Sequence, residues 1–383
     1  MVGAGQLARM THQAAIPLGQ SLKVLATRAD EPAALVAPSA EIGAHTDLEA
    51  LRAFARGCDA VTFDHEHVPG ELLRTLESEG VAVRPGPDAL LHAQDKLVMR
   101  RRLAELGLPV PAFAPVEAVE DAVAFGAEHG WPCVLKAARG GYDGRGVWVL
   151  DSAEEARSTV AELLGAGTPL LVERRAQLRR ELASVVARSP FGQGAAWPLT
   201  ETVQSEGICV QTLAPAPDAS AELADRAQDL ALTLAERLGV VGVLAVELFE
   251  TPDGLLVNEL AMRPHNSVHW TIEGARTSQF EQHLRAVLDY PLGSTELTAP
   301  AVVMANVLGA AEEPAMGVDE RVHHLFARFP HAKVHLYGKT ARPGRKVGHV
   351  TLLGADMAET RRQAGLAAHW LSRAEWPDGY EIH

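Results

Sequence analysis

A tight turn, Pro252-Asp253-Gly254, separates two apolar segments that each carry a single glutamate. Because these turn residues favour a hairpin, the pattern predicts paired strands over residues 243–249 and 254–259. Glu247 and Glu259 would then face each other in apolar surroundings. Two glutamates on strands are more often solvated edge charges, but burying a carboxylate without a partner is costly, so this neighbourhood indicates a bound cation. A Mg²⁺ ion that bridges the phosphates of ATP would suit two such carboxylates.

A cluster of polar residues, Arg263-Pro264-His265-Asn266-Ser267, follows the hairpin directly. Arginine presents a planar fork of donors to carboxylate or phosphate groups, and histidine exchanges protons near neutral pH. A loop packed by its own hydrogen bonds is the structural alternative. Beside two buried acids, the cluster favours an anion-binding element next to the metal site.

A glycine-rich segment lies between two predicted strands, 133–136 and 147–150, and has four glycines in residues 140–146. Glycines let backbone N–H groups approach an anion closely, and such a loop can close over it as a lid. Lys136, at the end of the preceding strand, could reach a phosphate from one side. The glycines alone leave an ordinary glycine-rich hairpin open as an alternative.

Two further segments have the composition of anion sites. The segment 342–349 contains three cations, Arg342, Arg345 and Lys346, which in an acidic protein would anchor a phosphorylated substrate, although such a run is more often a solvated turn. The segment Gly3–Ala8 fits the dinucleotide pattern G-x-G-x-x-A, which is a weak signal. Thr27 and Arg28, directly after the predicted strand 21–26, do not supply the acidic group that binds an NAD ribose. A helix N-terminus after a glycine turn could bind another phosphate.

The order of predicted elements divides the 383 residues into three units. Strands 21–26, 60–63 and 81–83 alternate with helices 48–56 and 70–79, which predicts an α/β domain with a parallel sheet over residues 1–92. Mixed helices and strands predict an α+β domain over residues 93–292, with a lid subdomain at about 110–175. Short strands such as 301–307 and 347–353 predict a small β-rich domain over residues 293–383.

Composition excludes several classes of protein. A formal net charge of −14 argues against a general nucleic-acid binder, which needs an excess of Lys and Arg. The three cysteines are far apart, which makes a disulfide framework improbable and fits a reducing cytoplasm. The sequence has neither an apolar run of the ~20 residues that span a bilayer nor a signal peptide pattern. We therefore expect a soluble cytoplasmic protein without nucleic-acid or membrane partners.

Taken together, these segments resemble the ATP-grasp superfamily and, within it, the N5-carboxyaminoimidazole ribonucleotide synthetases of purine biosynthesis. The resemblance runs essentially from end to end, and the segments that carry it are residues 3–10, 61–66, 140–146, 258–270 and 342–349. It implies an N-terminal Rossmann-like pre-ATP-grasp domain, a central ATP-grasp domain and a small C-terminal β-rich domain, commonly in a homodimer. The implied reaction converts ATP, bicarbonate and 5-aminoimidazole ribonucleotide into the N5-carbamate, ADP and phosphate through carboxyphosphate.

The resemblance also implies a role for each matching residue. The implied ATP-binding residues are Lys96, Lys136, Gly141, Tyr142, Asp143, Gly144, Arg145, Gly146, Glu173, Glu181, Gln204 and Asn258. The implied binding residues for the aminoimidazole ribonucleotide are Gln6, Glu66, Arg145, Arg342, Arg345 and Lys346. Glu247 and Glu259 would hold Mg²⁺, and the implied catalytic residues are Asp143, Arg263, His265, Asn266 and Lys346.

The sequence departs from the family pattern in three places. Gln204 stands where the family usually has histidine, and Met262 and Val268 replace proline and glycine around the bicarbonate loop. Only Met1 and Val2 precede the first glycine turn, where a strand of several residues is expected. We therefore expect the natural N-terminus to lie upstream of Met1.

Three other functions remain open from the residues alone. A related ATP-grasp ligase that activates formate or another carboxylate would share Glu247 and Glu259 but would not need the cations at 342–346. A nicotinamide-dependent oxidoreductase would use the turn at Gly3–Ala8 and leave residues 247–270 unexplained. A non-catalytic nucleotide-binding regulator would not need the acidic pair with its Arg and His neighbours.

Overall fold

The computed structural model describes residues 1–141 and 146–381. Its N-terminal region contains two parallel strands, β1 (Lys23–Ala26) and β2 (Ser39–Ile42). Val2 forms parallel bridges to Leu25 and to Phe63, so Met1–Gly3 lies between β1 and the segment that precedes Asp64. The region's helices are α1 (Gln6–Ala15), η1 (Ile16–Leu18), α2 (Leu48–Ala55), α3 (Gly70–Ser78) and α4 (Pro87–Gln94).

The predicted parallel α/β arrangement is therefore confirmed, although its strands are shorter than expected. The predicted strand 21–26 begins only at Lys23. The predicted strands 60–63 and 81–83 are reduced to single parallel bridges, of which one joins Val61 to Val83. These two segments are held in place mainly by apolar packing, since Val61, Phe63 and Val83 are all buried in the largest apolar core.

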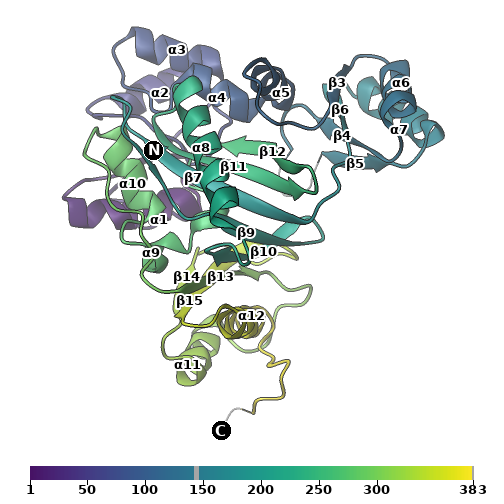
Figure 1. Cartoon of the computed structure of the whole chain (residues 1–383). Coiled ribbons are helices and arrows are strands. Elements are labelled where there is room, and N and C mark those ends of the chain that lie inside the picture. The colour runs from purple at the N-terminus through teal and green to yellow at the C-terminus, as the bar shows by residue number, and fades with distance from the viewer. Residues whose placement is uncertain (142–145, 382–383) are drawn as a thin grey trace.

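A small antiparallel sheet forms a separate lobe, seen at the side of the molecule in Figure 1. Helix α5 (Lys96–Glu105), capped by the Asp95 carboxylate, leads into this lobe. The strands, in spatial order, are β3 (Phe113–Val116), β6 (Leu170–Arg174), β4 (Cys133–Ala137) and β5 (Val147–Leu150). Helices α6 (Val119–His129) and α7 (Ala153–Gly165) cover one face of this sheet and share its apolar core.

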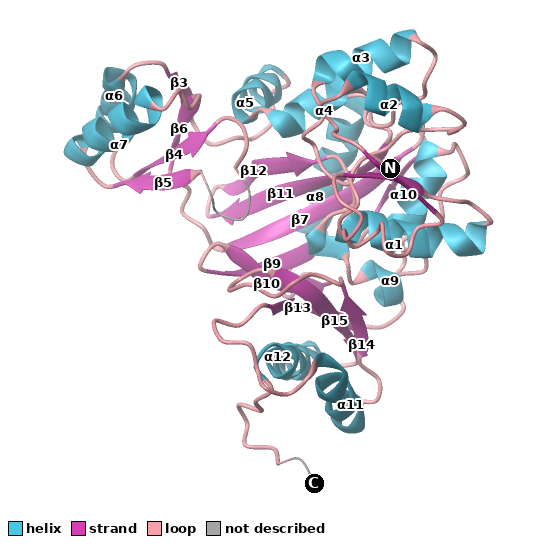
Figure 2. Cartoon of the chain, turned by 180° about the vertical axis from the view of Figure 1, so that it is seen from behind, coloured by secondary structure: helices cyan, strands magenta, loops and turns pink. Residues whose placement is uncertain are grey.

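A large antiparallel sheet forms the centre of the molecule (Figure 2). Its strands, in spatial order, are β12 (Gly254–Ala261), β11 (Gly242–Thr251), β7 (Arg180–Arg188), β9 (Thr200–Ser205), β10 (Ile208–Ala214), β13 (Ala301–Leu308), β15 (Lys346–Gly354) and β14 (Lys333–Leu336), and β8 (Gly194–Ala196) pairs with β7. The associated helices are α8 (Ala221–Arg237), η2 (Asn266–Val268), α9 (Thr271–Gly274), α10 (Gln279–Val287), α11 (Val318–Arg328) and α12 (Met357–Arg373).

The expected C-terminal unit is not a separate sheet. Strand β13 pairs with β10 through Gln211↔Ala305 and the three following pairs, so β13, β15 and β14 continue the central sheet. Helices α11 and α12 pack against this end of the sheet, away from the N-terminal region (Figure 1). None of the helices in the described part of the chain has the length and apolar character that crossing a membrane requires.

His283 on α10 joins the N-terminal region to the central sheet. Its Nε2 lies 2.7 Å from Thr62 Oγ1, and its Nδ1 accepts the Val243 N–H at 3.1 Å. Because Nδ1 is an acceptor, the ring is neutral and Nε2 carries its proton. Burial lowers the pKa of His283 from 6.5 to about 3, with the N-terminal amine adding to the effect.

This buried histidine should make the protein sensitive to acid. The pKa of His283 is lower in the folded than in the unfolded chain, so its contribution to stability is present above pH 6.5 and is lost as the pH falls towards 3. The loss should reach about 2 kcal/mol between pH 6.5 and pH 5, at about 1.4 kcal/mol per pH unit. In His283→Asn, we expect a lower Tm at pH 7 but a smaller fall in Tm on acidification. His323→Asn, which removes an exposed histidine from α11, should keep the wild-type pH profile, and an unchanged profile in His283→Asn would contradict the assignment.

Candidate active site

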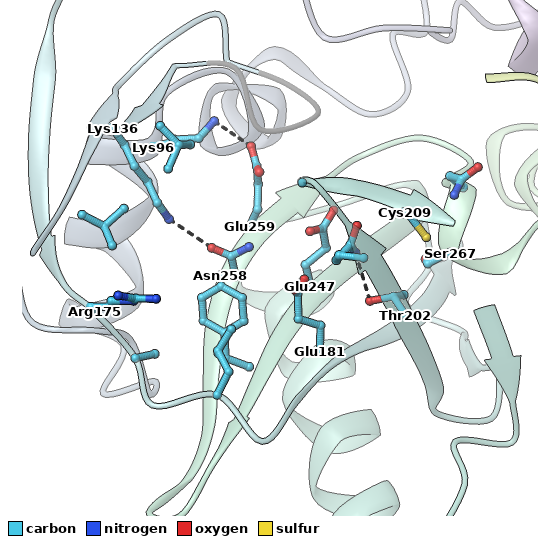
Figure 3. A pocket seen from close by; sticks show the side chains of 18 of the residues that line it. Lys96, Lys136, Arg175, Glu181, Thr202, Cys209, Glu247, Asn258, Glu259 and Ser267 are labelled. Atoms are coloured by element: carbon cyan, nitrogen blue, oxygen red, sulfur yellow. Dashed lines mark hydrogen bonds and ion pairs between the residues drawn. The ribbon is translucent and has the colours of Figure 1, made fainter. Parts of the chain in front are cut away.

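A β-bulge in the central sheet places three polar side chains on one wall of a cavity. Glu247 of β11 pairs with Glu259 of β12, but the next residue, Leu248, pairs with Val257, so Asn258 is the extra residue. A bulge of this kind turns two successive side chains towards the same side of a strand. Figure 3 shows Glu247, Asn258 and Glu259 directed into one cavity of about 540 Å³, which they line. The predicted hairpin is therefore confirmed, with a bulge at the acidic pair.

Each polar group on this wall has a cationic or donor partner. Lys96 Nζ lies 2.7 Å from Glu259 Oε1, and Lys136 Nζ donates to Asn258 Oδ1 at 3.1 Å. His265 Nε2 lies 3.2 Å from Glu247 Oε1. Burial acts to raise the pKa of Glu247, but His265, with smaller contributions from Lys346 and Arg263, holds it below its usual value. Glu247 is therefore held in its ionised form, which is the form that binds a cation.

A buried ion network, formed by Glu173 and Arg100, fixes the position of Lys136. The Glu173 carboxylate binds Lys136 Nζ at 2.8 Å and Arg100 Nε at 2.7 Å. Arg100 also donates from Nη2 to the carbonyl oxygen of Asn258, at the bulge, at 2.8 Å. Glu173, predicted to bind ATP, is therefore buried between two cations, and its side chain does not line the cavity. Arg100 was missed because it reads as a solvated residue in the run Arg100-Arg101-Arg102, and only the fold shows it turned inward.

The 540 Å³ cavity is also lined by Arg175, Glu181, Gln204 and Cys209. Glu181 lies beside Glu247 (Figure 3). Burial raises the pKa of Glu181, and the neighbouring Glu247 adds to this effect, while a hydrogen bond from Gln204 opposes it. Glutamine at position 204 thus keeps a donor beside Glu181. The structure brings both predicted residues to the same cavity as the acidic pair.

A second cavity of about 680 Å³ adjoins the first and is lined by Gln6, Glu66, Gly141 and Arg263. Six residues line both cavities: Lys96, Glu247, Glu259, His265, Asn266 and Lys346. Arg263 Nε binds Glu66 Oε2 at 2.7 Å, and Lys339 donates to Gln6 Oε1. Lys339 was missed because a lone lysine in a loop carries no motif. The polar residues between 247 and 266 therefore stand where the two cavities meet.

Met262 and Val268, which replace the usual proline and glycine, are fully buried on either side of the polar segment 263–267. Met262 belongs to the largest apolar core, and Val268 belongs to a core beneath β7, β11 and β13. Both substitutions therefore add packing under this segment and leave the cavity walls polar.

Several predicted residues lie elsewhere. Arg342 and Arg345 are exposed and line neither cavity, and Arg345 Nη1 donates to the Thr340 carbonyl at 3.1 Å. Gly146 also lines neither cavity and accepts the Ala137 N–H at 2.8 Å. Tyr142, Asp143, Gly144 and Arg145 lie outside the described residues.

The glycine turn at the N-terminus is already occupied by a carboxylate of the chain. Asp64 accepts the N–H groups of Gly5 and Ala8, the latter at 3.1 Å. A Cβ added at Gly5 would lie 2.4 Å from Asp64 Oδ2, so this glycine permits the close approach of Asp64. Asp64 therefore takes the anion position at the start of α1, while Gln6 of the same turn lines the 680 Å³ cavity.

Comparison with known proteins identifies relatives over the whole chain. The ribonucleotide synthetase preATP-grasp domain family matches residues 1–94, the ATP-grasp domain family matches 101–280, and the phosphoribosylaminoimidazole carboxylase C-terminal domain family matches 302–363. The N5-carboxyaminoimidazole ribonucleotide synthase of Mycobacterium tuberculosis is 64% identical over 384 residues, which cover 100% of this chain and 90% of that protein.

Two solved structures show the same architecture. The N5-carboxyaminoimidazole ribonucleotide synthetase of Thermus thermophilus superposes with a TM-score of 0.86 at 38% identity and covers 100% of both chains. The N5-carboxyaminoimidazole synthase of Aspergillus clavatus, in complex with ADP and 5-aminoimidazole ribonucleotide, gives a TM-score of 0.86 at 31% identity, covering 97% of this chain and 98% of that one.

Proposed function

This chain belongs to the N5-carboxyaminoimidazole ribonucleotide synthase family of ATP-grasp ligases, and from that membership we infer that it catalyses the ATP-dependent carboxylation of 5-aminoimidazole ribonucleotide in purine biosynthesis. We further propose that bicarbonate is the carboxyl donor and that it is activated as carboxyphosphate. The observation that carries this proposal is the meeting of two cavities at Glu247, Glu259, His265 and Asn266. One cavity would hold ATP and the other the ribonucleotide, with the reacting groups between them.

The donor set at the bulge suits Mg²⁺. Mg²⁺ is usually held by one or two carboxylates and completes its octahedron with phosphate oxygens and water. Glu247 and Glu259 would supply the two carboxylates, and the described residues contain no cluster of three or more His, Cys, Asp or Glu side chains that could hold a metal by itself. ATP would therefore provide the remaining oxygen ligands. Bound Mg²⁺ would neutralise charge on the phosphoryl group in transfer.

Binding of Mg²⁺ and ATP would require an exchange of charge partners. Lys96 now neutralises Glu259, and Lys136 is shared between Glu173 and Asn258. If Glu259 held a metal ion, the Lys96 ammonium would be available to bind the phosphates of ATP. Arg100 keeps Glu173 in place, so Lys136 retains its orientation into the cavity.

Bicarbonate and carboxyphosphate would bind at Arg263, His265 and Asn266. The Asn266 Nδ2 amide is buried and has no hydrogen-bond partner among the described residues, and a buried donor of this kind calls for an acceptor. In the first step a bicarbonate oxygen bonds to the γ-phosphorus while the bond to the bridging oxygen breaks and ADP leaves. The Arg263 guanidinium and the Asn266 amide would stabilise the charge that develops on the transferred group.

The aminoimidazole ribonucleotide would occupy the 680 Å³ cavity, with Gln6, Glu66 and Lys346 on its walls. Glu66 Oε1 is buried and without a partner among the described residues, so it is available to accept a hydrogen bond from the substrate. In the second step the exocyclic amine bonds to the carboxyl carbon, phosphate leaves, and the amine gives up a proton. Asp143, which stays a prediction, would orient that amine or take its proton.

We also propose the domain limits 1–92, 93–292 and 293–383, a homodimer and a cytoplasmic location. The largest apolar core contains residues from both sides of the limit at 92/93, and the central sheet contains strands from both sides of the limit at 292/293. The three domains would therefore move little relative to one another. Roles in ATP binding for the glycine loop, and in substrate binding for Arg145, Arg342 and Arg345, remain proposals.

Measurement of ADP release with purified protein tests the proposed function. The complete mixture contains ATP, Mg²⁺, bicarbonate and 5-aminoimidazole ribonucleotide, and each of the last two is omitted in turn. We expect ADP release to depend on both compounds and labelled bicarbonate to be fixed in step with it. ADP release that neither compound stimulates would contradict the proposal, and consumption of NADH or NADPH would favour an oxidoreductase.

A further inference from the structure

Gln279 holds the main chain of His265 on both sides. This glutamine is the first residue of α10 and is completely buried. Its Oε1 accepts the His265 N–H at 2.7 Å, and its Nε2 donates to the His265 carbonyl at 2.9 Å. One side-chain amide thus replaces the two hydrogen bonds that a neighbouring strand would make to that residue.

The amide of Gln279 is itself fixed by its neighbours. Its Nε2 lies 2.8 Å from His269 Nδ1, and its backbone N–H donates to Thr271 Oγ1 at 3.0 Å. Thr271 Oγ1 in turn donates to the Val268 carbonyl at 2.7 Å. Because the His265 main chain fixes Nε2 as the donor end of the amide, His269 Nδ1 is the acceptor. Burial lowers the pKa of His269 well below its usual value, which keeps the ring neutral. With both donor hydrogens and one acceptor site in use, the amide has one stable orientation.

The residue held in this way is at the centre of the site. His265 Nε2 faces Glu247 at 3.2 Å, its Nδ1 lies 2.9 Å from Ser267 Oγ, and the next residue, Asn266, lines both cavities. A rotation of the His265 main chain would therefore move the imidazole and the unpartnered Asn266 amide together. The hydrogen bonds of Gln279 oppose this rotation from a different element.

We propose that Gln279 is a positioning residue for the anion-binding segment 263–266. It fixes the main chain of His265 so that His265 and Asn266 keep carboxyphosphate beside the ribonucleotide amine. This inference rests on the proposed function, because it assigns carboxyphosphate to that segment. Without the two hydrogen bonds, the segment shifts and water reaches the intermediate, so ATP is consumed without carboxylation.

The same helix provides a matched control. Gln282 is also completely buried, donates from Nε2 to the Gly293 carbonyl at 2.9 Å, and accepts the Gly293 N–H at Oε1 at 2.7 Å. The contacts have the same form as those of Gln279, but Gly293 lines neither cavity. Replacing either glutamine with leucine removes a pair of main-chain hydrogen bonds from the same helix. Gln279→Leu also removes the contact with His269, and only this variant touches the anion-binding segment.

The experiment compares the two leucine variants with the wild type in three measurements: Tm, KM for ATP, and bicarbonate fixed per ADP released. We expect both variants to have a lower Tm than the wild type, with the larger fall in Gln279→Leu, which also leaves the buried His269 Nδ1 without its donor. In Gln279→Leu, kcat for carboxylation should fall by about 30-fold, since small displacements of positioned groups are costly. The amount of bicarbonate fixed per ADP released should fall at least about threefold, while KM for ATP stays within about threefold of wild type. Gln282→Leu should keep the wild-type ratio and kcat within about twofold.

Gln279→Glu keeps an acceptor for the His265 N–H but places an oxygen against the His265 carbonyl. The bicarbonate fixed per ADP released should therefore lie between the values for wild type and Gln279→Leu. A wild-type ratio in a folded Gln279 variant would overturn the inference. An equal loss of bicarbonate fixed per ADP released in Gln282→Leu would also overturn the inference. If both Gln279 variants failed to fold while Gln282→Leu folded, the role of Gln279 would be structural, and the inference would again be overturned. If bicarbonate and the ribonucleotide do not stimulate ADP release by the wild-type protein, the proposed function itself fails.

Discussion

Replacing Glu259 with glutamine should lower ADP release at saturating substrates by about 10³-fold, because the site loses one of its two metal-binding carboxylates. Glutamine has nearly the same shape and can remain near Lys96, so the fold should be preserved. The amide carries no charge to attract Mg²⁺, and Lys96 no longer neutralises a carboxylate at this position. A Mg²⁺ titration of the residual activity should show a midpoint shifted to higher concentration.

A matched change on the same hairpin separates this effect from a general loss of negative charge. Asp253 lies in the exposed turn between β11 and β12, and Asp253→Asn removes one charge at the far end of the hairpin. We expect Asp253→Asn to keep activity within about twofold of wild type, as surface substitutions usually do. Wild-type turnover in Glu259→Gln, or an equal loss in Asp253→Asn, would overturn the metal assignment.

The parts of the fold that local sequence encodes were predictable. The turn Pro252-Asp253-Gly254 and its flanking apolar runs predicted the β11–β12 hairpin, and the predicted strand 147–150 has the same limits as β5. The bulge at Asn258 was not predictable, because it depends on the register between two strands and on the contact from Arg100. Since the bulge directs Asn258 and Glu259 into one cavity, the side-chain pattern alone did not reveal the shape of the metal site.

The pairing of strands far apart in the sequence was the second feature that could not be predicted. Nothing in residues 208–214 or 301–308 indicates that these segments pair, yet this contact joins the C-terminal strands to the central sheet. The description of the C-terminal unit as β-rich also omitted α11 and α12, which pack their apolar faces on the sheet. The helical period shows that a face is apolar, but it does not show which surface will cover it.

The candidate site was predicted best where its residues are contiguous. Residues 258–266 bring an amide, a carboxylate, a guanidinium and an imidazole together in sequence, and they remain together in space. Arg100 and Gln279 were missed because polar residues on amphipathic helices usually face water, and only tertiary packing buries them. The run at 342–346 shows the same limit, since the structure brings Lys346 to the cavities but leaves Arg342 and Arg345 outside them.

Replacing Lys346 with methionine should lower kcat/KM for 5-aminoimidazole ribonucleotide by about 10²-fold, which corresponds to the loss of a charge-assisted contact worth about 3 kcal/mol. Lys346 is the first residue of β15 and lines both cavities. It also helps to hold the pKa of Glu247 below its usual value, so its ammonium acts at the junction of the two cavities. Methionine keeps most of the length of the side chain, so the loss should reflect the charge.

The expected loss is specific to the ribonucleotide, which is anionic and would bind beside this lysine. KM for ATP should therefore change by no more than about threefold, since Lys96 and Lys136 remain beside the 540 Å³ cavity that we propose for ATP. Lys333→Met removes an exposed lysine from β14, the neighbouring strand, and should leave both KM values near those of wild type. An unchanged KM for the ribonucleotide in folded Lys346→Met would remove this residue from the substrate site. An equal rise in both KM values would instead assign Lys346 to the charge balance around Glu247, because a less ionised Glu247 would bind Mg²⁺ and hence ATP more weakly.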